Sequence, residues 1–203
     1  MQGYAEEIRS AAANASNMIR QLLSVGRAPP GTDACADLHA ILRHAEASLR
    51  LHLRGDQSLV LSLAADNPLV GIPASRLDEV VRNLVLNARD AMPDGGTITI
   101  TTRRSKDASA PGSERIQLEV KDTGVGMDAR TMERIFEPFF TTKSPGQGTG
   151  LGLSTARMII EAAGGYIHVD SVPGSGTVFR IDLPLANASK THDKCLPDPR
   201  MGM

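Results

Sequence analysis

Glycines alternate through the stretch GQGTGLGLS at positions 146–154, which leads directly into an apolar helical pattern. Glycine permits positive φ angles and lets another molecule approach the backbone closely. A helix that begins at about Leu151 would also point its free amide groups, and the positive end of its dipole, at that molecule. We therefore expect an anion, and first of all a phosphate group, to bind at this stretch.

Three familiar nucleotide-binding and kinase signatures do not fit the sequence. There is no Gly-x-x-x-x-Gly-Lys-Ser/Thr, the glycines at 146, 148, 150 and 152 do not match Gly-x-Gly-x-x-Gly, and there is no His-Arg-Asp loop. A nucleotide, if one binds, must therefore be held in a different way.

Two asparagines lie on one face of the helical pattern ASRLDEVVRNLVLNARDAM at positions 74–92. Glu79, Asn83 and Asn87 follow one another at intervals of four residues, so their side chains share a face. A buried amide without a partner costs about 1 to 3 kcal/mol. An amide oxygen suits Mg²⁺, which often takes its remaining ligands from substrate phosphates. The alternative is that both asparagines only bind backbone groups.

Asp122 ends a strand pattern and is followed by Gly124 and Gly126 in the stretch KDTGVGMD. Because a carboxylate only accepts hydrogen bonds, it can select a ligand with an amino group, such as adenine. The alternative is an ordinary turn that begins with Asp and contains Gly.

The elements that must position these residues follow from hydrophobic periodicity. The sequence predicts helices over 37–54, 74–92 and 151–163, a short helical segment around 128–136, and strands over 58–64, 97–104, 115–122, 164–171 and 176–184. We expect Ser75 and Asp78 to form a capping pair at the start of the second helix. The long connection over 124–150 is typical of a lid. The stripe expected to face the core from helix 74–92 is Leu77, Val80, Val81, Leu84, Ala88 and Ala91.

The two ends of the chain differ from its middle. Ile8, Ala12, Ala15, Ile19 and Leu22 follow a heptad-like spacing that either packs on the chain's own domain or pairs with a second copy. Residues 187–203 are polar and lack periodicity, which predicts a flexible tail. The expected organisation is a partial dimerisation helix over 1–28, one domain over 34–186 and the tail.

Composition excludes several classes of function. The formal net charge is −1 at pH 7 and 3% of residues are aromatic, so neither a basic field nor stacking platforms recruit nucleic acid. The sequence contains no apolar stretch as long as a membrane span. We expect a cytoplasmic segment without direct membrane contact, although a longer parent protein could be attached to a membrane.

Five motifs, in this order, resemble the catalytic ATP-binding domain of bacterial sensor histidine kinases, within the superfamily of gyrase, chaperone, kinase and mismatch-repair ATPases. They are NLVLNARDA, DTGVGM, IFEPFFTTK, GTGLGLS and GSGTVF, and the resemblance covers roughly residues 37–185. The stretch FEPFFTTK distinguishes kinases from the gyrase-like and mismatch-repair-like branches. The resemblance implies an α/β fold, a two-layer Bergerat-type sandwich with a mixed, largely antiparallel sheet, helices on one face, and a preceding coiled-coil-like helix.

The resemblance also implies roles for individual residues. Asn87 would bind Mg²⁺, Asn83 would lie near the phosphates of ATP, and Lys143 would reach the terminal phosphates from the lid; these three are the expected catalytic residues. Asp122 would bind the adenine amine. The phenylalanines of the stretch IFEPFFTTK, Phe136, Phe139 and Phe140, would anchor the lid or dock it on a partner helix. The remaining expected nucleotide-binding residues are Gly124, Gly126, Met127, Gly148, Thr149, Gly150, Leu151, Gly152, Leu153 and Thr177.

The phosphoacceptor histidine of such kinases lies on a helical hairpin, and residues 6–25 resemble only the second helix of that hairpin. None of His39, His44, His52 and His168 precedes an acidic residue, and His192, which does, belongs to the tail. We therefore expect a histidine-bearing hairpin domain and a response-regulator receiver domain as partners, and no autophosphorylation of this chain. A truncated kinase and a natural protein that acts in trans remain alternatives. A non-catalytic nucleotide-binding regulatory module and an anti-sigma-type serine kinase are the rival functions.

Overall fold

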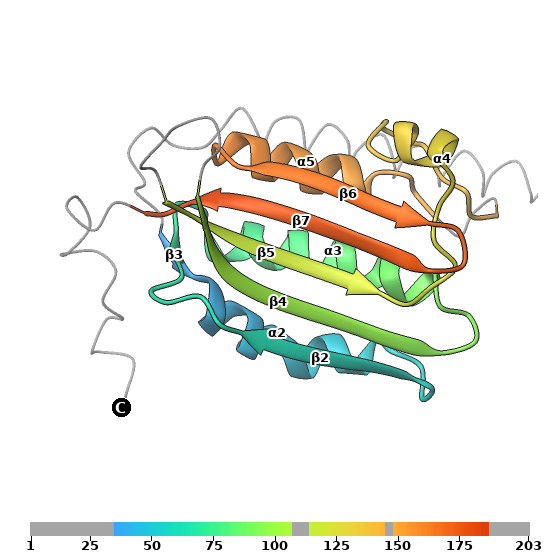
Figure 1. Ribbon diagram of the computed structural model, residues 1–203, viewed down its shortest axis with the longest axis horizontal. Helices are drawn as coiled ribbons and strands as arrows, with labels where there is room; N and C mark the ends of the chain where they lie inside the picture. Colours follow the sequence, from blue (N-terminus) through green and yellow to red (C-terminus); the bar gives the residue numbers. More distant parts are fainter. Residues whose placement is uncertain (1–34, 107–113, 145–147, 187–203) are drawn as a thin grey trace, which may run out of the picture.

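The computed structural model describes residues 35–106, 114–144 and 148–186, so the expected helix over 1–28 and the tail over 187–203 lie outside the described residues. The described part consists of a sheet covered on one face by helices (Figure 1). This is the α/β sandwich that the sequence predicts.

The main sheet has five strands in the order β2-β4-β5-β7-β6. Strands β2 and β4 pair in parallel, and all other pairs are antiparallel, so the sheet is mixed and largely antiparallel. A separate two-stranded sheet was not predicted, because strands of two residues carry no periodic signal. The main strands are β2 (Gln57–Leu63), β4 (Gly96–Lys106), β5 (Glu114–Asp122), β6 (Tyr166–Val172) and β7 (Gly176–Pro184), and the small sheet pairs β1 (Ala36–Asp37) with β3 (Leu69–Val70).

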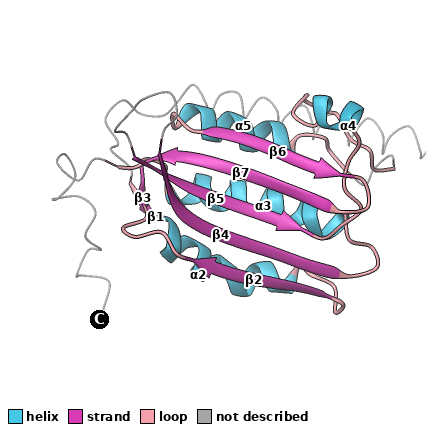
Figure 2. Ribbon diagram, viewed as in Figure 1, coloured by secondary structure: helices cyan, strands magenta, loops and turns pink. Residues whose placement is uncertain are grey.

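Three helices lie on one face of the main sheet, namely α2 (Leu38–Leu51), α3 (Ala74–Asp90) and α5 (Gly152–Ala162) (Figure 2). The short helix α4 (Ala129–Arg134) belongs to the connection between β5 and α5. Alternate residues of the central strands, such as Ile98 and Ile100, are fully buried against these helices. No helix among the described residues has the length and apolar character needed to cross a membrane.

The start of α3 differs from the predicted capping pair. The helix begins at Ala74 with Pro73 in the cap position, and no side chain caps it, while Ser75 is exposed within the first turn. The amides of Arg76 and Leu77 donate to the Pro73 carbonyl oxygen, 3.0 and 3.1 Å away. Proline suits a helix start because its φ is already fixed near the helical value and its missing N–H is not needed there. The capping prediction for Ser75 and Asp78 was therefore wrong.

The core face of α3 also differs slightly from the predicted stripe. Val85 is fully buried, although it was not predicted to be, and Ala91 is only half-buried, because it lies at the cap of the helix. The other predicted positions of the stripe are buried.

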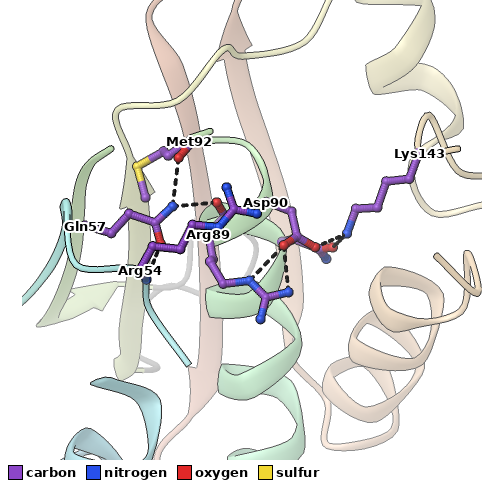
Figure 3. A network of polar contacts seen from close by, with 7 residues as sticks. Arg54, Gln57, Arg89, Asp90, Met92 and Lys143 are labelled. Carbon is purple, nitrogen blue, oxygen red and sulfur yellow. Dashed lines mark hydrogen bonds and ion pairs between the residues drawn. The ribbon is translucent and has the colours of Figure 1, made fainter. Parts of the chain in front are cut away.

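A glutamine side chain holds the C-terminal end of α3. Gln57 Nε2 donates to the carbonyl oxygens of Arg89 (2.9 Å) and Met92 (2.7 Å), and Gln57 Oε1 accepts from the Arg54 amide (3.1 Å) (Figure 3). The last carbonyls of a helix need such partners when they are buried. This contact fixes the end of α3 that carries Asn87.

Candidate functional site

Helix α3 contacts three chain segments in sequence along its length. Near its end, the Val125 amide donates to the Ala91 carbonyl oxygen at 2.9 Å, which ties down the loop after β5. One turn earlier, Lys143 Nζ lies 3.5 Å from Asn87 Oδ1, and one turn before that, Asn83 Nδ2 donates to the Gly152 carbonyl oxygen at 3.2 Å. The structure therefore brings the loop of Asp122, the segment of Lys143 and the start of α5 to the same helix.

Asp122 is a buried carboxylate at the end of β5. Its Oδ1 accepts from the amides of Gly124 (2.9 Å) and Thr177 (3.1 Å), whereas no described residue donates to its Oδ2. Burial raises the pKa of Asp122, and the two amide donors offset only part of that effect. Among the described residues, Oδ2 therefore has no hydrogen-bond donor, and an amino group is the kind of donor that a carboxylate oxygen accepts.

The loop around Asp122 is held by a serine that the sequence analysis missed. Ser171 Oγ accepts from the Met127 amide at 2.8 Å and lies 2.9 Å from Thr177 Oγ1. A serine within a strand carries no distinctive sequence signal, so only the contact reveals its role.

The glycines of this loop are required by the chain itself. A Cβ at Gly126, whose φ is +67°, would lie 2.1 Å from the Val172 carbonyl oxygen, and one at Gly124 would lie 2.5 Å from the Ala91 carbonyl oxygen. Bare backbone in the stretch 146–154 is expected to let a ligand approach closely. At these two positions the close approach is made by other parts of the chain.

The glycine-rich stretch combines packing with open helix amides. Gly150 has a φ of +65°, its carbonyl oxygen accepts from the Phe139 amide at 2.9 Å, and a Cβ there would lie 2.3 Å from the Phe139 carbonyl carbon. By contrast, a Cβ at Gly152 would make only ordinary contacts, the nearest at 3.6 Å to Asn83. The side chain of Leu151, which occupies the cap position of α5, makes no hydrogen bond to the first turn, and no described side chain is seen to cap the amides there.

The other expected residues of this stretch lie close by. Thr149 is exposed and its Oγ1 accepts from the Leu151 amide at 3.4 Å, while Leu153 is half-buried on α5. Gly148 lies beside Lys143: a Cβ at Gly148 would be 3.2 Å from Lys143 Cδ. The stretch therefore adjoins the lysine.

Lys143 forms an ion pair with an aspartate that the sequence analysis did not single out. Its Nζ lies 2.5 Å from Asp90 Oδ2, while Arg89 Nη2 lies 2.6 Å from Asp90 Oδ1. Burial by itself would raise the pKa of Asp90, but hydrogen bonds and positive charge from Lys143 and Arg89 outweigh it and lower the pKa. Its position three residues after Asn87 is the signal that could have pointed to it.

The phenylalanines differ in their environments. Phe136 and Phe140 are half-buried beneath the guanidinium groups of Arg157 and Arg134, with 5.4 and 4.4 Å to the ring centroids. Phe139 is 52% exposed and has a φ of +68°. The first two rings are held within the chain, and the third faces outward.

Comparison with known proteins places this site in a family. Residues 73–187 match the family described as histidine kinase-, DNA gyrase B- and HSP90-like ATPase. The chain is 39% identical over 194 residues to sensor kinase CckA of Brucella abortus, covering 92% of this chain and 20% of that protein. It is 37% identical over 174 residues to sensor histidine kinase ZraS of Salmonella typhi, covering 84% of this chain and 35% of that protein.

A solved structure agrees with these sequence matches. The nucleotide-free catalytic domain of histidine kinase ThkA superposes with a TM-score of 0.58 at 28% identity, covering 74% of this chain and 94% of that domain. The fold and the matched motifs define an ATP-binding domain of the histidine kinase, gyrase B and HSP90 class. Within that family, the chain belongs to the sensor histidine kinases as their catalytic ATP-binding domain, and it spans about a fifth to a third of the two curated relatives.

Proposed function

We propose that this chain binds Mg-ATP along α3 and delivers the γ-phosphoryl group to a histidine of a helical-hairpin domain. One observation carries the proposal: Asp122 is buried, with Oδ1 satisfied by the Gly124 and Thr177 amides and Oδ2 left as an acceptor. Adenine has the amino group that such an oxygen selects. Gly126 and Met127 belong to the same loop and would contact the base.

The phosphates would lie at the uncapped start of α5. Gly148, Thr149, Gly150, Leu151, Gly152 and Leu153 would bind them largely through backbone amides, with Asn83 beside Gly152. Lys143 would add positive charge at the terminal phosphates. Catalysis then consists mostly of positioning and electrostatic stabilisation.

The residues present fit a magnesium ion. Asn87 Oδ1 is a neutral oxygen and already faces a cation, the ammonium of Lys143 at 3.5 Å. When bound, Mg²⁺ would neutralise phosphate charge. Asn87 would hold the ion, and its place on α3 fixes that oxygen relative to α5.

The phosphoacceptor would come from outside the described residues. His39 is buried with Nε2 2.7 Å from Thr102 Oγ1, and His52 Nδ1 lies 2.7 Å from the Ser48 carbonyl oxygen. We further propose the division into a helix over 1–28, the catalytic domain over 34–186 and a tail, with a receiver domain as the partner downstream and dimerisation through the helix.

The test offers the chain two acceptors in the presence of Mg²⁺ and γ-labelled ATP. We expect acid-labile label on a histidine-bearing helical hairpin, none on its His→Ala variant and none on a serine-bearing anti-sigma antagonist. Label on the serine protein would identify a serine kinase. Nucleotide binding without label on either acceptor would identify a non-catalytic module, and each of these outcomes overturns the proposal.

A further inference from the structure

Asp90 brings a negative charge to the part of α3 that would face the phosphates (Figure 3). Its carboxylate binds Lys143 through Oδ2 and Arg89 through Oδ1. Both Asp90 and Lys143 are partly buried. A carboxylate at this place opposes the binding of an anionic nucleotide unless a cation compensates it.

Lys143 has two competing partners in this arrangement. In the structure its ammonium contacts Asp90 Oδ2 at 2.5 Å and Asn87 Oδ1 at 3.5 Å. These two oxygens, one charged and one neutral, are hard donors of the kind that Mg²⁺ prefers. If Lys143 moves to a phosphate, Asp90 therefore keeps only Arg89 as a cationic partner among the contacts described above. Asp90 then also lies near the negative charge of the phosphates.

We propose that Asp90 determines specificity for the magnesium-loaded nucleotide over the metal-free nucleotide. This inference rests on the proposed function. For metal-free ATP, the phosphates must compete with Asp90 for Lys143 and also meet the charge of Asp90. In the magnesium complex, Asn87 and Asp90 would hold the ion, the charge of Asp90 would be compensated there, and Lys143 would bind the terminal phosphate.

A purely structural role for Asp90 makes a different prediction. If its carboxylate only anchored the Lys143 segment to α3, loss of the carboxylate would change the stability of the chain, or it would weaken the binding of magnesium-loaded and metal-free nucleotide to the same degree. It would not change the ratio of their affinities. The ratio is therefore the informative quantity.

The experiment measures the binding of a non-hydrolysable ATP analogue to the full chain by calorimetry, once with Mg²⁺ and once with a chelator. For Asp90→Asn, we expect tighter metal-free binding and a fall of about fivefold in the preference for the Mg²⁺ complex, the upper range for one partly exposed charge pair. Asp90→Glu keeps the charge and should retain the preference. Asp90→Ser serves the same purpose if Asp90→Asn does not fold.

Glu46→Gln is the matched control, because it removes a carboxylate that pairs with Arg50 on α2, at 2.7 Å, outside the site. Its preference for the Mg²⁺ complex should equal that of the unmodified chain. An unchanged preference in Asp90→Asn would overturn the role of Asp90 and leave the proposed function intact. An unmodified chain that binds neither form of the analogue would overturn the proposed function, and the inference with it.

Discussion

Asp122 shows how one side chain can serve the fold and a ligand at once. Its Oδ1 joins the loop after β5 to the start of β7 through the Gly124 and Thr177 amides, and no described residue donates to its Oδ2. Burial raises the pKa of this carboxyl group, so the charged form is held at a cost. An amino group that donates a hydrogen bond to Oδ2 would stabilise the charged carboxylate and offset this cost.

Replacement of Asp122 by Asn should change which purine the site accepts. The Asn oxygen can still accept from the two amides, but an NH₂ donor then stands where Oδ2 was. We expect ATP affinity to fall by roughly 10- to 100-fold, in line with the loss of a hydrogen bond to a charged group and a donor facing a donor. Inosine triphosphate has an acceptor in place of the adenine amine. Its affinity for Asp122→Asn should therefore fall less than that of ATP, or should rise.

The dissociation constants of ATP and inosine triphosphate, measured for the unmodified chain and for Asp122→Asn, check this prediction. Asp128→Asn is the control, because Asp128 is exposed and caps α4, and asparagine caps helices equally well. If Asp122→Asn left the ratio of the two constants unchanged, Asp122 would not contact the base.

Single residues were predicted where a motif surrounds them and were missed where contacts between distant segments define their role, although the spacing of Asp90 from Asn87 was a usable signal. Asp122, Asn87 and Lys143 stood out through their motifs, and the structure places the last two side by side. Ser171 and Asp90 did not, since a strand serine and a helical aspartate are common on surfaces. Their roles come from neighbours that are distant in sequence.

At the scale of elements, periodicity predicted the helices and strands well because most of them have one buried face. The errors lie at element ends. The start of α3 was misjudged because Pro73 fixes it through backbone geometry alone, and the small sheet of β1 and β3 is too short to show a pattern. Ends depend on single backbone angles and distant partners, which periodicity does not encode.

The packing of α2 on β4 predicts how stability depends on pH. His39 of α2 is buried against Thr102 of β4, and burial lowers its pKa, assisted by Arg43 and opposed by Asp37. Below a pH of about 6.5 the unfolded chain binds a proton at this histidine that the folded chain resists, so the free energy of unfolding falls as the pH falls. Each unit by which the pKa is lowered corresponds to about 1.4 kcal/mol.

Urea unfolding between neutral and mildly acidic pH measures this effect. In His39→Gln the side chain at position 39 cannot titrate, so the free energy of unfolding should fall less as the pH is lowered. In His44→Gln, at an exposed position of the same helix, it should fall as much as in the unmodified chain. Equal declines in the unmodified chain and in His39→Gln would show that His39 does not contribute.

At the scale of the whole molecule, the arrangement of the sheet explains why the site forms where it does. The Asp122 loop follows β5, β7 begins beside it, and both are interior strands in the order β2-β4-β5-β7-β6. Helices α3 and α5 cross the same face and bring Asn83 to Gly152. The class of fold was predictable from the motifs. The mixed character of the sheet was predicted, but the sequence did not show that β2 and β4 are the strands that pair in parallel. The choice of partner strands depends on contacts between residues that are distant in sequence.

The most direct test of the account is a crystal structure of the chain with Mg²⁺ and a non-hydrolysable ATP analogue. We predict that the adenine amine lies within hydrogen-bonding distance of Asp122 Oδ2 and that the phosphates contact the first turn of α5. A base bound away from Asp122, or phosphates bound away from α5, would contradict the account.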